Sequence, residues 1–176
     1  LHRREGIKII PSQNEQGASL AADAYSRTSG KLGIVVTTCG PGIINALQGL
    51  ACSYYDSIPA LYISGAPVTG LLKKNKKLRQ LGFQEMEIQE IVSSFTKYST
   101  RITDVKKIFY EIEKSIFLAK EGRPGPCIID LPDDIQRMET NADEQEIFKP
   151  EVKKLTIDST KVEKVINMVN ESKRPI

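Results

Sequence analysis

The stretch GIVVTTCGPGIINALQGLACSYYDSIPALYIS, residues 33–64, decides the fold. It begins with a β-branched run at 33–38, passes through the tight turn CGPG, and continues as a helical pattern over 43–55. A second apolar run comes next, at 59–64. Continuous apolar strands that are joined by a helix are typical of a parallel sheet with both faces covered.

The same alternation extends in both directions from this unit. Toward the N-terminus, we expect a strand at 7–10 and a helix at 15–29 that ends at Gly30. Toward the C-terminus we expect a polar loop at 66–82, helices at 84–95 and 105–120, and strands at 98–102 and 127–132. The sequence therefore predicts an α/β domain with a parallel sheet covered by helices on both faces. Ligands bind such sheets outside the carboxyl ends of the strands.

The composition changes at the end of this domain. Residues 1–136 are predicted to form the α/β domain, and 137–158 are polar and weakly periodic, as in an interdomain linker. Residues 159–176 are expected to start a central domain with a helix capped by Ser159. The first residue is not Met and a strand is predicted almost at once, so we expect a piece of a longer polypeptide.

Composition and charge narrow the classes of function. The 176 residues are 40% hydrophobic and carry a net charge of +3, which is too small to argue for nucleic acid or an anionic membrane as a partner. No apolar run reaches the roughly 18 residues of a membrane helix, and no signal-peptide pattern is present. Cys39, Cys52 and Cys127 lack CxxC spacing, which indicates reduced thiols in a cytoplasmic protein. The single histidine, His2, argues against a histidine triad or a histidine-rich metal site.

Glu15 stands where an apolar run meets the first helix. An acid at this position can simply complement the helix dipole, and this structural interpretation stays open. Its neighbours Gly17, Ala18 and Ala21 are small, however, and would let another surface approach closely. A partly desolvated carboxyl group would have a raised pKa, which suits proton exchange.

The turn CGPG is the second candidate. Gly40 and Gly42 would let the backbone approach a ligand at the start of the next helix, and Asn45 would face the same cleft. A plain turn between strand and helix fits equally well. The turn has neither the GxGxxG spacing of a dinucleotide loop nor the lysine of a phosphate loop.

The loop at 66–82 is rich in basic residues. A solvated surface loop is the expected interpretation of such a charge run, although loops longer than about 12 residues often act as lids. Phe83 and Gln84 close the loop, within reach of a pocket. Lys97, Asp130 and Asp134 are interpreted as structural residues.

Four stretches together are more specific than any one of them. They are NEQGASLAADAYSRTSGK, TTCGPGIINALQGLACSYYDSIPALYISG, LGFQEMEIQEIVSSFTKY and AKEGRPGPCIIDLPDDIQ. Their order and spacing resemble the N-terminal pyrimidine-binding domain of thiamine-diphosphate-dependent enzymes, and within these the large subunit of acetolactate synthase. The resemblance covers about residues 5–136 and begins after the first strand and helix of the usual domain.

The resemblance implies roles for the candidate residues. Glu15 matches the acid of the family's (H/N)EQ motif, which shares a proton with N1′ of the cofactor's aminopyrimidine so that the cofactor can lose its C2 proton. Gly40, Pro41, Gly42 and Asn45 match positions that contact the cofactor. Phe83 and Gln84 match the substrate side of the cleft. Asn14 replaces a commoner His and Cys39 replaces the usual Ser.

The resemblance also implies what lies outside this chain. In the family, Mg²⁺ and the diphosphate are bound by another domain, and the active site forms between two subunits. We therefore expect a homodimer or homotetramer, a chain that is inactive alone, and no nucleic-acid or membrane partner. The residues leave open whether FAD also binds.

Three functions remain in competition at this point. The leading one is part of a thiamine-diphosphate-dependent synthase or decarboxylase that acts on 2-keto acids, with acetolactate-synthase-like carboligation. The alternative is a non-catalytic module for dimerisation or ligand binding. Glu15 favours the enzyme, because an acid in a desolvated cleft is costly without a partner. A nucleotide-binding α/β domain is weakened by the missing fingerprint.

Overall fold

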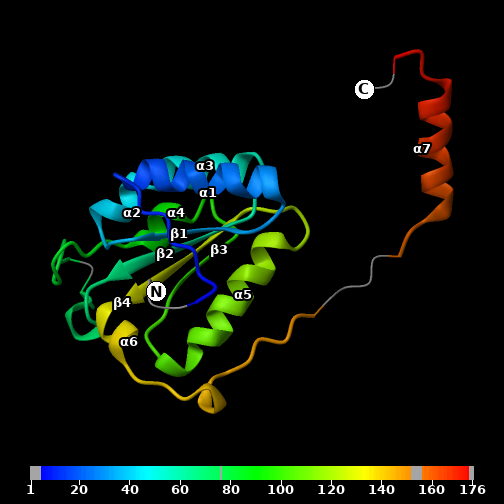
Figure 1. Ribbon diagram of the computed structural model, residues 1–176. Coiled ribbons are helices and arrows are strands. Elements are labelled where there is room, and N and C mark those ends of the chain that lie inside the picture. Colours follow the sequence, from blue (N-terminus) through cyan, green and yellow to red (C-terminus); the bar gives the residue numbers. More distant parts are fainter. Residues whose placement is uncertain (1–4, 76, 152–155, 175–176) are drawn as a thin grey trace.

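Four parallel strands form one sheet at the centre of the molecule. The computed structural model describes residues 5–75, 77–151 and 156–174 (Figure 1). The strand order is β1-β2-β4-β3, with β1 at Gly33–Thr37, β2 at Ala60–Ala66, β4 at Pro126–Pro132 and β3 at Tyr98–Arg101. All three pairings are parallel, so the predicted α/β class is confirmed.

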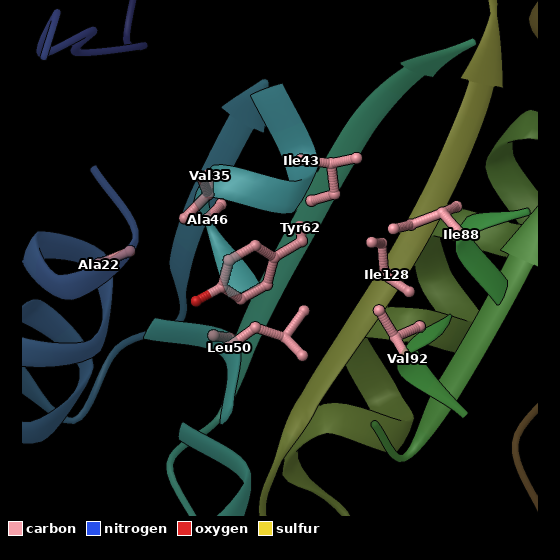
Figure 2. Close-up of a cluster of buried hydrophobic side chains, with 10 residues drawn as sticks. Ala22, Val35, Ile43, Ala46, Leu50, Tyr62, Ile88, Val92 and Ile128 are labelled. Atoms are coloured by element: carbon pink, nitrogen blue, oxygen red, sulfur yellow. The ribbon is translucent and has the colours of Figure 1, made fainter. Parts of the chain in front are cut away.

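Helices cover the two faces of this sheet. One face packs against α1 (Glu15–Ser29), α2 (Pro41–Asn45), α3 (Leu47–Tyr55) and α4 (Ile88–Val92). The other face packs against α5 (Ile108–Lys120) and α6 (Asp133–Arg137). Because side chains alternate along a strand, Tyr62 of β2 enters the first core and its neighbour Leu61 the second. Figure 2 shows Tyr62 lying among Ala46, Leu50 and Val35.

Glycines allow α1 to pack closely against β1 and α3 on the first face of the sheet. A Cβ at Gly33 of β1 would lie 2.3 Å from the carbonyl oxygen of Ala22 in α1. A Cβ at Gly49 of α3 would lie 2.4 Å from Oγ of Ser19. Ala22 and Gly49 are buried, so these small residues belong to the packing within one chain. Their close approach places the start of α1 beside α2 and α3.

Three sequence predictions of elements need correction. Residues 7–10 form no strand, and within the described ranges no strand pairs with them. The helix predicted over 43–55 is divided at Ala46, whose N–H donates to the carbonyl of Ile43, three residues back. The helix predicted over 84–95 shortens to α4, because Gln84 has a left-handed backbone that no helix begins with.

The segment after α6 lies partly along α5. Gln145 is buried; its side-chain amide donates to the carbonyl of Val105 over 3.0 Å and its Oε1 accepts from the N–H of Phe109 over 3.3 Å. The ring of Phe148 packs edge-to-face on Tyr110, with centroids 5.5 Å apart. The first part of the predicted linker therefore adds to the covering of α5.

The last helix, α7 (Ser159–Glu171), stands apart from the sheet (Figure 1) and has no buried residue. Its N-cap is Asp158, whose carboxylate accepts from the N–H groups of Thr160 and Lys161, so the prediction that Ser159 caps it is wrong by one residue. Across the described ranges, no helix combines the length and apolar character needed to cross a membrane.

Candidate functional site

The candidate residues gather at the carboxyl ends of the strands, where a parallel sheet places its sites. A small cleft lies between the turn after β1, the end of β2 and the end of β4. Its lining includes Cys39, Gly40, Ser64, Gln84 and Asp130.

Glu15 begins α1, and its carboxylate is fixed from a second helix. Asn14 caps α1 by accepting the N–H of Gly17 on its side-chain oxygen over 2.7 Å. The side-chain amide of Asn45, the last residue of α2, donates to Oε2 of Glu15 over 2.9 Å. Hydrogen bonds from Asn45 and from its own backbone N–H hold the pKa of Glu15 below its ordinary value, against a smaller opposing effect of burial. The expectation of a raised pKa is therefore wrong for this chain.

The turn between β1 and α2 lies against this carboxylate. A Cβ at Gly42 would lie 3.3 Å from Oε1 of Glu15 and 2.5 Å from Cγ2 of Thr38. Gly42 is buried, whereas Pro41, at the first helical position of α2, is exposed. The absence of a side chain at Gly42 leaves the space next to the second carboxylate oxygen free on this side.

The other end of the same turn touches Gln84. Gly40 has φ +59° and ψ −112°, which excludes a side chain, and a Cβ there would lie 2.4 Å from the carbonyl oxygen of Gln84. Gln84 itself has φ +58°. The thiol of Cys39 lies 3.7 Å from Oε1 of Gln84. The turn thus separates Glu15 on one side from Gln84 on the other, whereas Phe83 is 80% exposed and does not line the cleft.

Two charged residues of the site were not predicted to belong to it: Asp130 was interpreted as structural, and Arg101 was not considered. Asp130 is buried at the end of β4 and lines the cleft, and Arg101 at the end of β3 pairs with it, Nε to Oδ2, over 2.6 Å. Burial raises the pKa of Asp130, and the ion pair with Arg101 opposes this effect. An acid that ends the apolar run CIID was the available signal, because binding residues favour this position.

The long basic loop is also organised by one carboxylate. Buried Glu85 accepts from the backbone N–H groups of Lys73 (2.6 Å), Leu81 (2.8 Å) and Gly82 (3.3 Å). Burial alone would raise the pKa of Glu85, but the three amides and the charge of Lys73 together hold it below its ordinary value. The loop is therefore closed at its base next to Gln84.

The arrangement can exchange or share a proton and accept hydrogen bonds. Glu15 offers a carboxylate with one oxygen held by Asn45 and the other against Gly42. Among the described residues, no group of three or more His, Cys, Asp or Glu side chains is placed to hold a metal ion.

Comparisons with known proteins agree with this geometry. Residues 1–91 match the family described as thiamine pyrophosphate enzyme, N-terminal TPP binding domain. Over its whole length, the chain is 36% identical to a chloroplastic acetolactate synthase of Arabidopsis thaliana, of which it covers 26%. Over 79% of its length, it is 40% identical to the acetolactate synthase large subunit of Lactococcus lactis subsp. lactis (strain IL1403), of which it covers 23%.

A third relative gives the same picture. Over 74% of its length, the chain is 41% identical to the acetolactate synthase large subunit of Buchnera aphidicola subsp. Acyrthosiphon pisum (strain APS), of which it covers 22%. The chain thus spans about a quarter of the length of these relatives. Since the family match covers residues 1–91 and the relatives align over most or all of the chain, this protein belongs to the thiamine pyrophosphate enzymes and carries their N-terminal TPP-binding domain.

Proposed function

We propose that the full-length protein is a thiamine-diphosphate-dependent enzyme that decarboxylates a 2-keto acid and joins the product to an acceptor, as an acetolactate synthase does. The observation that carries this proposal is the Glu15 carboxylate, which Asn45 holds at the carboxyl end of the sheet beside the backbone of Gly42. The names of the relatives, all acetolactate synthases, support the choice of reaction.

The residues present fit an aminopyrimidine ring. Such a ring needs a carboxylate that can share a proton with a ring nitrogen, and a surface that lets it approach closely. Glu15 supplies the carboxylate, and the turn Gly40–Pro41–Gly42 lies beside it with no side chain at either glycine. We assign Glu15, Gly40, Pro41, Gly42 and Asn45 to cofactor binding. When bound, thiamine diphosphate supplies the electron sink for cleavage of the 2-keto acid.

The chain's own residues would then do three things. Glu15 would hold or move a proton at a carboxylate oxygen; its lowered pKa keeps the group ionised at neutral pH and makes it a weaker base. Asn45 would fix the orientation of the carboxylate through its hydrogen bond. On the other side of the turn, Gln84 would present its side-chain amide to the substrate, with the more exposed Phe83 at the rim.

The proposal also covers the oligomeric state, the metal ion and the cellular location of the protein. We propose a homodimer or homotetramer in which the cofactor lies at a subunit interface, with Mg²⁺ and the diphosphate held by a domain outside this chain; FAD stays open. The cytoplasm is proposed from the three free cysteines, which suit a reducing compartment, although the plant relatives are chloroplastic. The division into a domain at 1–136, a linker at 137–158 and a further domain from 159 also stays a proposal.

One experiment tests this function directly. The full-length protein is purified, freed of cofactor, and assayed with pyruvate and other 2-keto acids, with and without thiamine diphosphate and Mg²⁺. We expect carbon dioxide release and a coupled product only when both are added. Tight binding of thiamine diphosphate without turnover of any 2-keto acid would favour the non-catalytic module instead. Calorimetry on the isolated chain should give weak or undetectable binding of thiamine diphosphate.

A further inference from the structure

We propose that Arg101 and Asp130 are positioning residues, which hold Gln84 against Gly40 and so fix one wall of the cleft. The ion pair itself lies outside the proposed contacts with cofactor. The link between Gln84 and turnover rests on the proposed function. The clamp, by which Arg101 and Asp130 hold the backbone at Gln84, is argued from geometry alone.

The conformation of Gln84 needs such a clamp. Its φ of +58° lies in the left-handed region, which is unfavourable for a residue with a Cβ and which glycine normally occupies. Its carbonyl oxygen is in the space that a side chain at Gly40 would need. A left-handed Gln persists only where the surrounding structure determines it, and such residues cluster at ligand sites.

Arg101 binds the backbone two residues after Gln84. Its guanidinium donates from NH2 to the carbonyl oxygen of Met86 over 2.9 Å and from Nε to Oδ2 of Asp130 over 2.6 Å. The NH1 nitrogen lies 3.7 Å from a carboxylate oxygen of Glu87. The planar guanidinium of Arg101 thus connects the end of β4 with the segment that carries Gln84.

Asp130 provides the rigid end of this connection. Its side chain is only 4% exposed and belongs to β4, an inner strand of the sheet, whereas residues 80–87 form a loop. Arg101 is 16% exposed, so solvent screens the pair weakly. The Glu85 carboxylate accepts hydrogen bonds from the amides of residues 73, 81 and 82, and so holds the chain that precedes Gln84. Gln84 is therefore held from both directions.

The first test measures the clamp without activity. Arg101→Gln is made in the full-length holoenzyme, and amide hydrogen exchange is followed by mass spectrometry. We expect exchange in peptides covering 83–88 to accelerate by about tenfold or more, with little change in peptides from β1 and β2. The matched control is Arg137→Gln, which breaks an exposed Arg–Asp pair in α6 and should leave 83–88 unchanged. Unchanged exchange in 83–88 in folded Arg101→Gln overturns the clamp.

Removal of Arg101 alone leaves Asp130 buried and unpaired, which can impair folding. The double variant Arg101→Gln/Asp130→Asn removes both charges and keeps the shape of the buried Asp130 side chain, so it should fold and still show faster exchange in 83–88. Arg101→Lys keeps the charge but not the fork, and should restore the exchange rate only in part. Wild-type exchange in the folded double variant would overturn the clamp.

The second test asks whether the clamp acts through Gln84. In a double-mutant cycle, Arg101→Gln should lower kcat in the wild-type background but have little further effect in the Gln84→Ala background. Equal fold-losses in both backgrounds would overturn action through Gln84. Wild-type kcat and KM in Gln84→Ala would refute the substrate role given to Gln84 in the proposed function, whereas hydrogen exchange would still decide the clamp.

Discussion

The side-chain amide of Asn45 donates to the carboxylate of Glu15 over 2.9 Å, across 30 residues of sequence. This bond joins the first residue of α1 to the last residue of α2, the helix that the turn at 39–42 leads into. It lowers the pKa of Glu15 and fixes the direction in which the other oxygen points. The proposed chemistry depends on this oxygen.

Glu15→Gln in the full-length enzyme should abolish most turnover and leave the fold intact. The amide keeps the shape of the carboxyl group but cannot accept the proton, so kcat should fall by about 10²- to 10⁴-fold. Steady-state kinetics with a 2-keto acid gives kcat, and circular dichroism gives Tm. The matched control is Glu163→Gln on the exposed surface of α7, which should keep both values. Near-wild-type turnover of Glu15→Gln would refute the assignment.

The geometry of Gly40 predicts a second outcome. Gly40→Ala puts a Cβ at φ +59° and 2.4 Å from the carbonyl oxygen of Gln84, so backbone strain and steric overlap act together. Gly30→Ala is the matched control, because Gly30 has φ +67° and no atom within 4 Å of the added Cβ. The control should lose about 1–2 kcal/mol from left-handed strain alone, and Gly40→Ala about 1–3 kcal/mol more, because its ψ of −112° adds strain to the overlap. Urea unfolding measures both. Equal losses would show that the turn and Gln84 move apart freely.

The alternation of apolar runs and helices was enough to predict the fold and the place of the turn at 39–42. Because that turn follows a strand, Gly40 could be placed at the carboxyl edge of the sheet from the sequence alone, whereas Glu15 was expected there from a strand at 7–10 that does not form. The strand expected at 7–10 was wrong because an apolar run does not encode a partner strand. Arg101 was not considered and Asp130 was interpreted as structural, because their contact spans 29 residues and the sequence near either residue does not indicate the other as its partner.

The conformation at Gln84 could not be predicted from the sequence for a different reason. The segment 84–95 reads as one amphipathic helix, and only the tertiary structure places the Glu85 carboxylate among loop amides and turns Gln84 left-handed. Tertiary contacts outweigh helix propensity here, as they do wherever a buried charge finds several donors.

Glu85→Gln should destabilise the domain in a pH-dependent way. The pKa of Glu85 lies below its ordinary value of 4.5 in the folded chain, so the carboxylate stabilises the fold fully above that value. This stabilisation is lost as the pH falls through the lower, folded-state pKa. The variant should therefore lose about 1–3 kcal/mol near pH 7, and the difference from wild type should shrink below about pH 4.5.

Chemical unfolding between pH 3 and pH 7 measures this difference. The matched control is Glu139→Gln at an exposed position, for which the difference should be small at every pH. A loss for Glu85→Gln that is the same at both ends of the range would mean that the three amides do not depend on its charge.

Because the backbone of Gln84 is left-handed, we expect substitutions at this residue to change stability and activity independently. Gln84→Gly removes both the side-chain amide and the backbone strain, whereas Gln84→Ala removes the amide and keeps the strain. Both variants should lose turnover, but the glycine variant should be more stable than the alanine variant by about 1 kcal/mol. Gln136 in α6 is the matched control site, since in a helix alanine is favoured over glycine by about 1 kcal/mol. Melting curves of the four variants, with kcat for the Gln84 pair, measure both effects. If alanine is the more stable residue at 84 as well as at 136, Gln84 does not hold its left-handed conformation in solution, and the wall of the cleft that depends on it is not fixed.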